Sequence, residues 1–331
     1  MGFFDIFTQK IGIDLGTSNT LVYVNNKGIT VNEPSVVAIN VNTNEVCAVG
    51  EAAKAMLDRT PKTINAIRPL QNGVIADFEV TRAMIKYFID KALNKKRFVK
   101  SNIVICVPVG VTSIERRAVE EVAYDAGAKR VKLVEEPMAA AIGAGLNVSQ
   151  PVGNMIVDIG GGTTEIAVIS LGGIVVSDSI RIAGDDMDVN IRDYMKAKYK
   201  MEIGLVTAEK IKITIGNASE KFYSLHREYT RSEENNENYE NNENNNEKSE
   251  NNNEKNGKNE NNEDIEYDDD NYKKYEYPQE MKIRGRDIVS GLPLTITVTS
   301  DEIREAIIET VNSIVNAIKR VLEKTPPELA S

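Results

Sequence analysis

The stretch "VDIGGGTTEIAVIS", residues 157–170, decides the fold of this chain, because it joins two apolar segments through an aspartate, three glycines and two threonines. Gly160, Gly161 and Gly162 carry no side chains, so they permit a tight turn and bring backbone N–H groups close to a bulky ligand. Successive N–H groups of this kind form a cradle for phosphate. Asp158, just before the turn, is placed to hold a hydrated Mg²⁺. Taken alone, the stretch is equally well explained as an ordinary glycine hairpin with a surface aspartate.

A second segment, "GIDLGTSNT" at residues 12–20, repeats the same order of apolar strand, aspartate, glycine-rich turn with hydroxyl groups, and apolar strand. One such motif is weak evidence for a phosphate site. Two of them, with Asp14 and Asp158 separated by 144 residues, indicate two related α/β domains that grip one polyphosphate from both sides. We therefore expect the two aspartates to face the same metal ion.

The composition fits a chain of two domains. It has 331 residues, of which 41% are hydrophobic, enough for two cores. Cys47 and Cys106 lack the spacing of a zinc site, and the single histidine, His226, lies beside a polar tract, which argues against histidine-based catalysis. No apolar run has transmembrane length, and the first residues lack the basic region and cleavage site of a signal peptide. We expect a cytoplasmic protein of a reducing compartment.

The net charge of −10 comes from one low-complexity tract, residues 232–276. Its 45 residues include 16 Asn, 16 Asp or Glu and 5 Lys, so the tract carries a charge of −11 and the remaining chain +1. Such a composition cannot bury enough apolar surface to offset the entropy of ordering its backbone. We therefore expect a disordered insertion over residues 226–280. A tolerated surface loop is favoured over a functional acidic arm, because a long loop adds little closure entropy.

Strands and helices alternate outside this tract. The run "NIVICVPVG", residues 102–110, is apolar almost throughout, as in a buried strand of a parallel sheet. One helix is predicted to end near Gly127, and another begins at "EEPMAAAIGAGLN" with Pro137 in its first turn. A last helix begins at a capping box of Thr299 and Glu302 and ends before two prolines. Its buried stripe is predicted to comprise Ile303, Ile307, Val311, Ile314, Ile318 and Leu322.

Together these segments resemble the MreB family of bacterial actins, within the actin and sugar-kinase superfamily. The likeness is carried by "IGIDLGTSNTLVYV", "TPKTINAIRPLQNGVIADFEVTRAMIKYFI", "EEPMAAAIGAGLNV", "MIVDIGGGTTEIAVISLGGIV", "IRGRDIVSGLP" and "VLEKTPPELAS", and it covers nearly the whole chain apart from the Asn/Glu-rich tract. The resemblance implies an α/β, actin-like (ribonuclease H-like) fold of duplicated domains, with four subdomains around a nucleotide cleft. It also implies an ATP- and Mg²⁺-dependent filament protein, a weak ATPase coupled to polymerisation, which organises cell-wall synthesis and maintains rod shape.

The resemblance also implies where the subdomains begin and end. The expected ranges are 1–32 and 74–147 for the first large subdomain, 33–73 for the first small one, 148–181 and 300–331 for the second large one, and 182–299 for the second small one, which contains the insertion. Relatives continue beyond "TPPELAS" into a strand and a third glycine-rich turn. We therefore expect an incomplete second large subdomain and poor ATP binding by this chain.

Roles for individual residues follow from the same resemblance. Glu136 would position or deprotonate the attacking water, with Glu135 as its rival, and Thr163 would sense the γ-phosphate. Asp14 and Asp158 would hold Mg²⁺ through water. The nucleotide would be bound by Thr17, Ser18, Asn19, Gly160, Gly161, Gly162, Thr163, Gly184, Asp185, Glu209, Lys210, Ile211 and Lys212. For Glu209 and Lys212, a surface pair at i, i+3 on a helix is nearly as good an interpretation.

Two segments suggest contact with a membrane surface. "MGFFDIF" places Phe3 and Phe4 among other apolar residues, and "KKRFVK" presents Phe98 and Val99 among basic ones. Such segments suit insertion into a bilayer interface with attraction to anionic lipid. An N-terminal segment packed on the domain and a solvated loop are the structural alternatives. The expected partners are further copies of the chain, the inner face of the cytoplasmic membrane and the cell-wall elongation machinery, and no nucleic acid.

Other classes of protein share part of this pattern. A sugar kinase has both phosphate hairpins but needs a substrate-binding carboxylate in its first domain, for which we identify no candidate. A DnaK-type chaperone shares the hairpins as well and carries a separate peptide-binding domain. A fragment with impaired ATP binding that acts only as an interaction module is the remaining alternative.

Overall fold

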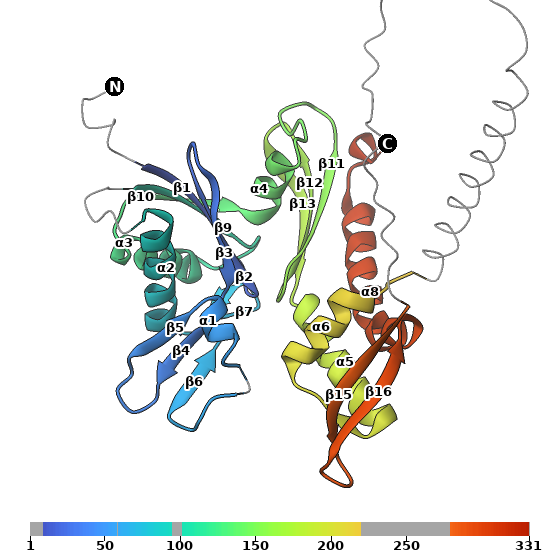
Figure 1. Cartoon of the computed structure of the whole chain (residues 1–331). Coiled ribbons are helices and arrows are strands. Elements are labelled where there is room, and N and C mark those ends of the chain that lie inside the picture. Colours follow the sequence, from blue (N-terminus) through green and yellow to red (C-terminus); the bar gives the residue numbers. More distant parts are fainter. Residues whose placement is uncertain (1–8, 58, 95–100, 220–278, 331) are drawn as a thin grey trace, which may run out of the picture.

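The computed structural model describes residues 9–57, 59–94, 101–219 and 279–330. Two α/β halves lie side by side, each with a large sheet and a smaller unit (Figure 1). Among the described residues, none of the helices combines the length and the hydropathy that a membrane span requires. The predicted membrane residues lie outside the described ranges, as does nearly all of the predicted insertion: Phe3, Phe4, Phe98, Val99 and residues 226–278.

The first half is built on a five-stranded sheet. Its strands are, in order across the sheet, β10 (Ala128–Glu135), β9 (Ser101–Val107), β1 (Gln9–Leu15), β2 (Asn19–Val24) and β3 (Gly28–Pro34). β1 pairs antiparallel with β2 and parallel with β9, and β9 pairs parallel with β10. Successive side chains of a strand point to opposite faces, so alternate residues of β1 and β9 are buried.

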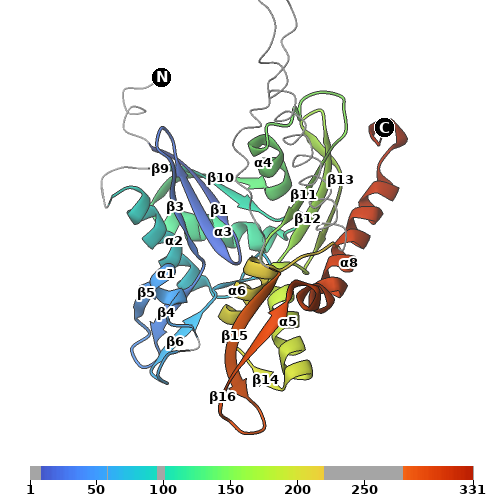
Figure 2. The same cartoon turned by 45° about the vertical axis from the view of Figure 1, so that its right-hand side comes forward.

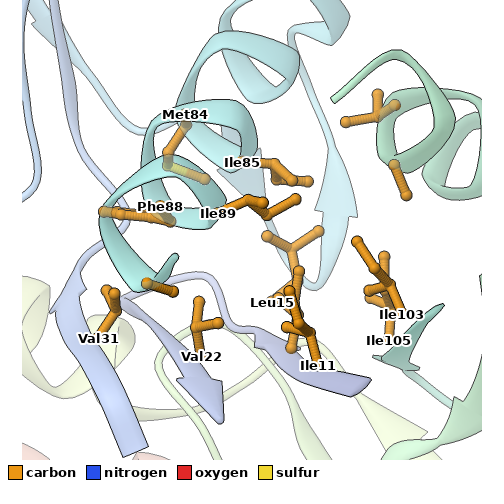
Figure 3. Packing of buried hydrophobic residues seen from close by; sticks show 14 of the residues in the cluster. Ile11, Leu15, Val22, Val31, Met84, Ile85, Phe88, Ile89, Ile103 and Ile105 are labelled. Carbon is orange, nitrogen blue, oxygen red and sulfur yellow. The ribbon is translucent and has the colours of Figure 1, made fainter. Parts of the chain in front are cut away.

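Two helices, α2 (Phe78–Ala92) and α3 (Ser113–Asp125), cover one face of this sheet and close the main core. Phe88 of α2 is fully buried and lies over the strands that carry Val22 and Val31 (Figure 3). Burial of a Phe side chain of this kind contributes about 1.5–3 kcal/mol. This core fixes the strand ends from which the first glycine-rich turn projects.

The second half repeats the hairpin on a three-stranded sheet. The sheet consists of β11 (Asn154–Ile159), β12 (Thr164–Ser170) and β13 (Gly173–Ile180), in this order, with α4 (Glu136–Gly143) on one face and α8 (Ser300–Lys324) on the other (Figure 2). Every residue of β12 is buried, because both faces of the strand are covered. Ile166 and Val168 pack toward α8, and Ala167 and Ile169 toward α4.

Each half also carries a smaller unit. In the first half these elements are β4 (Val37–Asn40), β5 (Val46–Val49), α1 (Glu51–Lys54), β6 (Ile64–Ile67), β7 (Leu70–Gln71) and β8 (Val74–Ile75). In the second half they are α5 (Gly184–Tyr199), β14 (Met201–Glu202), α6 (Leu205–Ile215), β15 (Glu280–Asp287) and β16 (Pro293–Thr299), and η3 (Pro327–Leu329) follows α8. Asn72 and Gly73 form the two-residue turn between β7 and β8, and both have positive φ (50° and 75°), as a type I′ turn requires.

The predicted last helix is α8, and its capping box is present, but its buried stripe differs from the prediction. Val321 is fully buried, whereas Leu322 is 47% exposed. An α-helix turns about 100° per residue, so Val321, five full turns after Ile303, points in the same direction as Ile303, and Leu322 points about 100° away. The prediction that Leu322 belongs to the stripe is therefore wrong.

The insertion ends earlier than predicted. Glu280, assigned to the insertion, is the first residue of β15 and pairs with Thr299 of β16. The antiparallel ladder with β16 therefore holds the chain already at this point. The subdomain boundaries stay a prediction, and β3 runs on to Pro34, past the expected boundary at residue 32.

Candidate functional site

A cavity of about 340 Å³ lies between the two halves, within the usual range of ligand pockets (about 300–1,000 Å³). Its walls include hairpin 1, the β1–β2 turn at residues 16–18, and hairpin 2, the β11–β12 turn at residues 160–163. The predicted residues that line it are Asp14, Thr17, Ser18, Asn19, Glu136, Asp158, Gly160, Gly161, Thr163, Gly184, Asp185, Glu209 and Lys212. The chain thus brings together residues from both halves that are up to 198 positions apart.

Three predicted nucleotide residues lie elsewhere. Gly162 is a buried residue of hairpin 2 that does not line the cavity, and a Cβ atom there would lie 3.0 Å from the Thr17 side chain. Lys210 is exposed on α6, and Ile211 is fully buried in the core of the second small unit. On a helix, neighbouring positions point about 100° apart, so Lys210 and Ile211 cannot share the direction of Glu209 and Lys212 at once.

The two hairpins touch each other at one end of the cavity. A Cβ atom at Gly161 would overlap Ser18 Oγ, so only glycine permits this approach. Ser18 Oγ donates a hydrogen bond to Asp185 Oδ1 at the start of α5 (2.9 Å). Arg68 reaches the same pair, with its Nη1 atom 3.0 Å from Ser18 Oγ and 3.5 Å from Asp185 Oδ1. This contact joins hairpin 1, the first small unit and the second half.

Glu209 and Lys212 do not pair with each other, so the interpretation as an i, i+3 surface pair is wrong. Glu209 forms an ion pair with Lys54 of the first small unit (2.8 Å), which crosses from one half to the other. Lys212 Nζ lies 2.8 Å from Asp188 Oδ1 and donates to the carbonyl of Gly184 (2.7 Å). Both side chains therefore point into the cavity region and are held by partners on other elements.

The cavity concentrates acidic groups that burial keeps from water. Burial raises the pKa of Asp14, with repulsion from Asp158 as a second cause, and burial also raises the pKa of Asp158. The pKa of Glu136 rises to about 8, first through burial and then through the charges of Glu165, Asp14 and Asp158. Its neighbour Glu135 does not line the cavity and accepts a hydrogen bond from Arg116 instead (3.3 Å).

A model of the protein family described as "MreB/Mbl protein" matches residues 8–229 and 258–331. The chain belongs to the MreB/Mbl family. The resemblance of the sequence to this family is thereby confirmed, and the gap in the match, residues 230–257, overlaps the first part of the Asn/Glu-rich tract.

Curated relatives from several bacteria support the same assignment. The cell shape-determining protein Mbl of Bacillus cereus is 48% identical over 326 residues, which cover 98% of this chain and 82% of the relative. Mbl of Bacillus subtilis is 47% identical over the same shares. The cell shape-determining protein MreB of Escherichia coli K12 is 44% identical over 332 residues, or 98% of this chain and 80% of the relative.

Solved structures confirm the predicted actin-like α/β fold. The crystal structure of MreB5 of Spiroplasma citri bound to ADP gives a TM-score of 0.77 at 36% identity and covers 98% of this chain and 81% of that one. The same protein bound to AMPPNP gives a TM-score of 0.75 at 35% identity, with the same coverage. A structure described as the MamK double helical filament gives a TM-score of 0.68 at 18% identity and shows a shared fold alone.

The MreB/Mbl cavity fits a cation held through water. Asp14 and Asp158 line the same cavity, and the charge of each raises the pKa of neighbouring carboxyl groups. A divalent cation bound there would reduce this repulsion. Within the described part of the chain, no three Asp, Glu, His or Cys side chains lie close enough to ligate one ion directly. Mg²⁺ keeps several of its waters in proteins, so this donor set fits a hydrated Mg²⁺ bound with a phosphate.

Three residues of the site were missed at the level of sequence. Glu165 and Asp188 line the cavity and are almost fully buried, and Arg68 joins the contact between hairpin 1 and α5. A signal for Glu165 was available, because "TEIAVIS" places one glutamate in an apolar strand, and buried charges need partners. Asp188 and Arg68 were not recognised, because Asp188 follows two other aspartates in the sequence and the partners of Arg68, Ser18 and Asp185, are 50 and 117 residues away.

Proposed function

We propose that this chain binds Mg-ATP in the cleft between its halves and assembles into actin-like filaments that maintain rod cell shape. The observation that carries the proposal is that Asp14 and Asp158, from two copies of one hairpin, line a single cavity. The names of the relatives, cell shape-determining proteins, support the cellular role. The ADP- and AMPPNP-bound neighbours support nucleotide binding, and membership of the actin-like MreB/Mbl family supports self-assembly.

In this proposal the two hairpins bind the phosphates from opposite sides. Backbone N–H groups of glycine-rich turns bind phosphate oxygens, and the side chains of Thr17 and Asn19 stand at the same wall. Asp14 and Asp158 would hold the cation through its bound waters. Lys212, fixed by its contacts to α5, marks the side of the cavity toward the ribose and base.

Glu136 is the residue that orients or deprotonates the attacking water. It stands at the first position of α4, where β10 ends, and lines the cavity. Bound Mg²⁺ would neutralise charge on the phosphates and on the carboxylates around them. Phosphoryl transfer depends mainly on such neutralisation and on positioning, so one oriented carboxylate is sufficient, and we expect a weak ATPase.

Closure of the cleft links nucleotide binding to assembly. Ser18, Asp185 and Arg68 join the two halves, and the ion pair of Lys54 with Glu209 joins the two small units. A nucleotide held by both hairpins favours this closed arrangement, because it contacts both sides of the cleft. Nucleotide binding therefore increases the population of the closed conformation, which is the conformation that assembles. Membrane attachment through Phe3, Phe4, Phe98 and Val99 is part of the proposal and rests on the sequence pattern.

Isothermal titration with Mg-ATP, followed by electron microscopy of the protein with ATP and anionic vesicles, tests the proposal. We expect weak but saturable binding, in line with the poor ATP binding predicted from the sequence. This binding should be lost in Asp14→Ala and Asp158→Ala and kept in the matched control Asp301→Ala, whose carboxylate lies on α8 outside the cavity. Filaments on vesicles would support the cytoskeletal function. Binding without any polymer, together with phosphorylation of a hexose, would support a kinase instead.

A further inference from the structure

Glu165 is a buried carboxylate that joins the two halves at the floor of the cavity. It belongs to β12 in the second half and is 1% exposed. Its Oε2 atom accepts a hydrogen bond from the backbone N–H of Val109, which belongs to the first half (2.9 Å), and its Oε1 atom accepts one from the hydroxyl of Ser179 on β13. Each carboxylate oxygen therefore has one donor, and the two donors come from different halves.

Val109 leads directly to the proposed catalytic glutamate. It follows β9 by two residues, and the last residue of β9, Val107, pairs with Glu135 of β10. Glu136 is the next residue after Glu135 and begins α4. A carboxylate that holds Val109 therefore holds the end of β9, and the β9–β10 ladder transfers this restraint to the position of Glu136.

Hairpin 2 lies close to the contact between Glu165 and Val109. A Cβ atom at Gly73 would lie 2.8 Å from Pro108 Cγ and 3.1 Å from Thr163 Cγ2, so the loop after β9, the β7–β8 turn and hairpin 2 meet in close contact. Thr163 is two residues from Glu165 along the chain. The loop after β9 is thus held by Glu165 and packs against Gly73, which in turn contacts Thr163, beside the cavity that Thr163 and Glu165 line.

We propose that Glu165 is a positioning residue for phosphoryl transfer, which fixes the loop after β9 and thereby sets Glu136 relative to hairpin 2. The inference rests on the proposed ATPase function and adds a residue to it. Glu165 acts through geometry, because both of its oxygens are engaged by protein donors. Burial raises the pKa of Glu165, whereas its hydrogen bonds from Ser179 and Val109 favour the ionised form that accepts both.

Replacement of Glu165 by glutamine distinguishes an effect of geometry from an effect of charge, because glutamine keeps the shape of the side chain and removes its charge. In Glu165→Gln the amide oxygen can accept from Val109, and the amide NH₂ can donate to the Ser179 hydroxyl, which is also an acceptor. Single-turnover hydrolysis by Glu165→Gln should stay within about threefold of wild type, the scale of one net hydrogen bond. Glu165→Ala should slow hydrolysis on the order of a hundredfold, the cost of a misplacement of about 1 Å, with the Kd for Mg-ATP changed by less than about threefold.

Hydrogen exchange of the Val109 amide measures its hydrogen bond to Glu165 independently of ATP hydrolysis. Its exchange should accelerate by about tenfold in Glu165→Ala and stay slow in Glu165→Gln. Ser179→Ala is the matched control, because it removes the donor of the second half alone and should leave both Val109 exchange and hydrolysis near wild type. Should Glu165→Ala fail to fold by circular dichroism, Glu165→Asp replaces it, since its side chain is one methylene too short to reach both donors.

The following outcomes would contradict the positioning role of Glu165 or the proposed function. A wild-type chain that binds ATP, with Glu165→Gln as slow as Glu165→Ala, overturns the positioning role in favour of a charge effect. Equal hydrolysis by wild type and Glu165→Ala, or an unchanged Val109 exchange, overturns it as well. A wild-type chain that neither binds nor hydrolyses ATP refutes the proposed function itself, and the inference with it.

Discussion

Replacement of Lys212 by methionine tests how the second small unit tolerates a buried acid. Lys212 Nζ lies 2.8 Å from Asp188 Oδ1, and the Asp188 side chain is only 7% exposed. Methionine keeps the length of the side chain and removes the charge. Asp188 then has to remain ionised without its cation or to bind a proton.

Protonation of Asp188 sets an upper limit on the stability that the variant loses through this group. Burial raises the pKa of Asp188 from 3.8 to about 6, although the hydrogen bond and charge of Lys212 lower it. If the protonated carboxyl does not interact with the lysine, the part of the loss in stability that comes from Asp188 is at most the free energy of protonating this group. That free energy is about 0.4 kcal/mol at pH 6, about 1.4 kcal/mol at pH 7 and about 2.7 kcal/mol at pH 8. The loss of about 3–5 kcal/mol expected for an uncompensated buried charge is therefore not reached at neutral pH.

The sign of the pH dependence follows from the same pKa. The folded-state pKa of Asp188 lies above its unfolded value, so its contribution to stability is fully present below pH 3.8 and declines as the pH rises to about 6. Without Lys212 the pKa of Asp188 rises further, and the decline continues above pH 6. The difference between variant and wild type should therefore grow from pH 6 to pH 8.

Urea unfolding at pH 6, 7 and 8, followed by circular dichroism, measures this difference. Asp188→Asn combined with Lys212→Met should show no growth with pH, because the titrating group is absent, and the exposed Lys210→Met on the same helix is the matched control. A smaller, pH-independent loss is expected in every Lys212 variant, since its hydrogen bond to the Gly184 carbonyl is removed. A loss that is equal at pH 6 and pH 8 would refute the role assigned to Asp188.

Three further predictions address the cavity and the core. Glu136→Ala should slow hydrolysis of ATP by about 10²–10⁴, the range of general acid–base catalysis, while filaments persist; unchanged hydrolysis would place the role elsewhere. Gly161→Ala should weaken Mg-ATP binding measured by titration calorimetry, because its Cβ would overlap hairpin 1, whereas Gly143→Ala, with no heavy atom within 4 Å of the added Cβ, should bind like wild type. In urea unfolding, Val321→Ala should lower the free energy of unfolding by about 2 kcal/mol and Leu322→Ala by less than about 0.5 kcal/mol. A larger loss in Leu322→Ala would show that Leu322 belongs to the buried stripe, as the sequence predicted.

Features that depend on local sequence could be predicted. The two glycine-rich turns follow from Gly residues at positions where the backbone approaches itself closely, as at Gly16, where a Cβ atom would lie 2.6 Å from the carbonyl oxygen of Asn19. The capping box at Thr299 is encoded by two residues three positions apart. Each of these features is decided within one turn or hairpin, so the sequence nearby contains the necessary information.

Contacts between distant elements could not be predicted in the same way. Glu209 meets Lys54, 155 residues away, and Glu165 meets Val109, 56 residues away. Such pairs depend on how the two halves are placed, which spacing within a helix or strand does not contain. The same reason explains the wrong pairing of Glu209 with Lys212, because helix geometry alone offered that partner.

The duplicated hairpin makes a site that neither half could form alone. Asp14 and Asp158 come to face one space only because β1 and β11 end at the same cavity. Burial raises the pKa of Glu136 there, and the charges of Glu165 and of the two aspartates raise it further. A group with a pKa of about 8 is largely protonated at neutral pH, and a neutral carboxyl cannot take a proton from water. A cation bound by the two aspartates would offset their charges and favour the ionised form of Glu136, which is the form that could accept a proton from water.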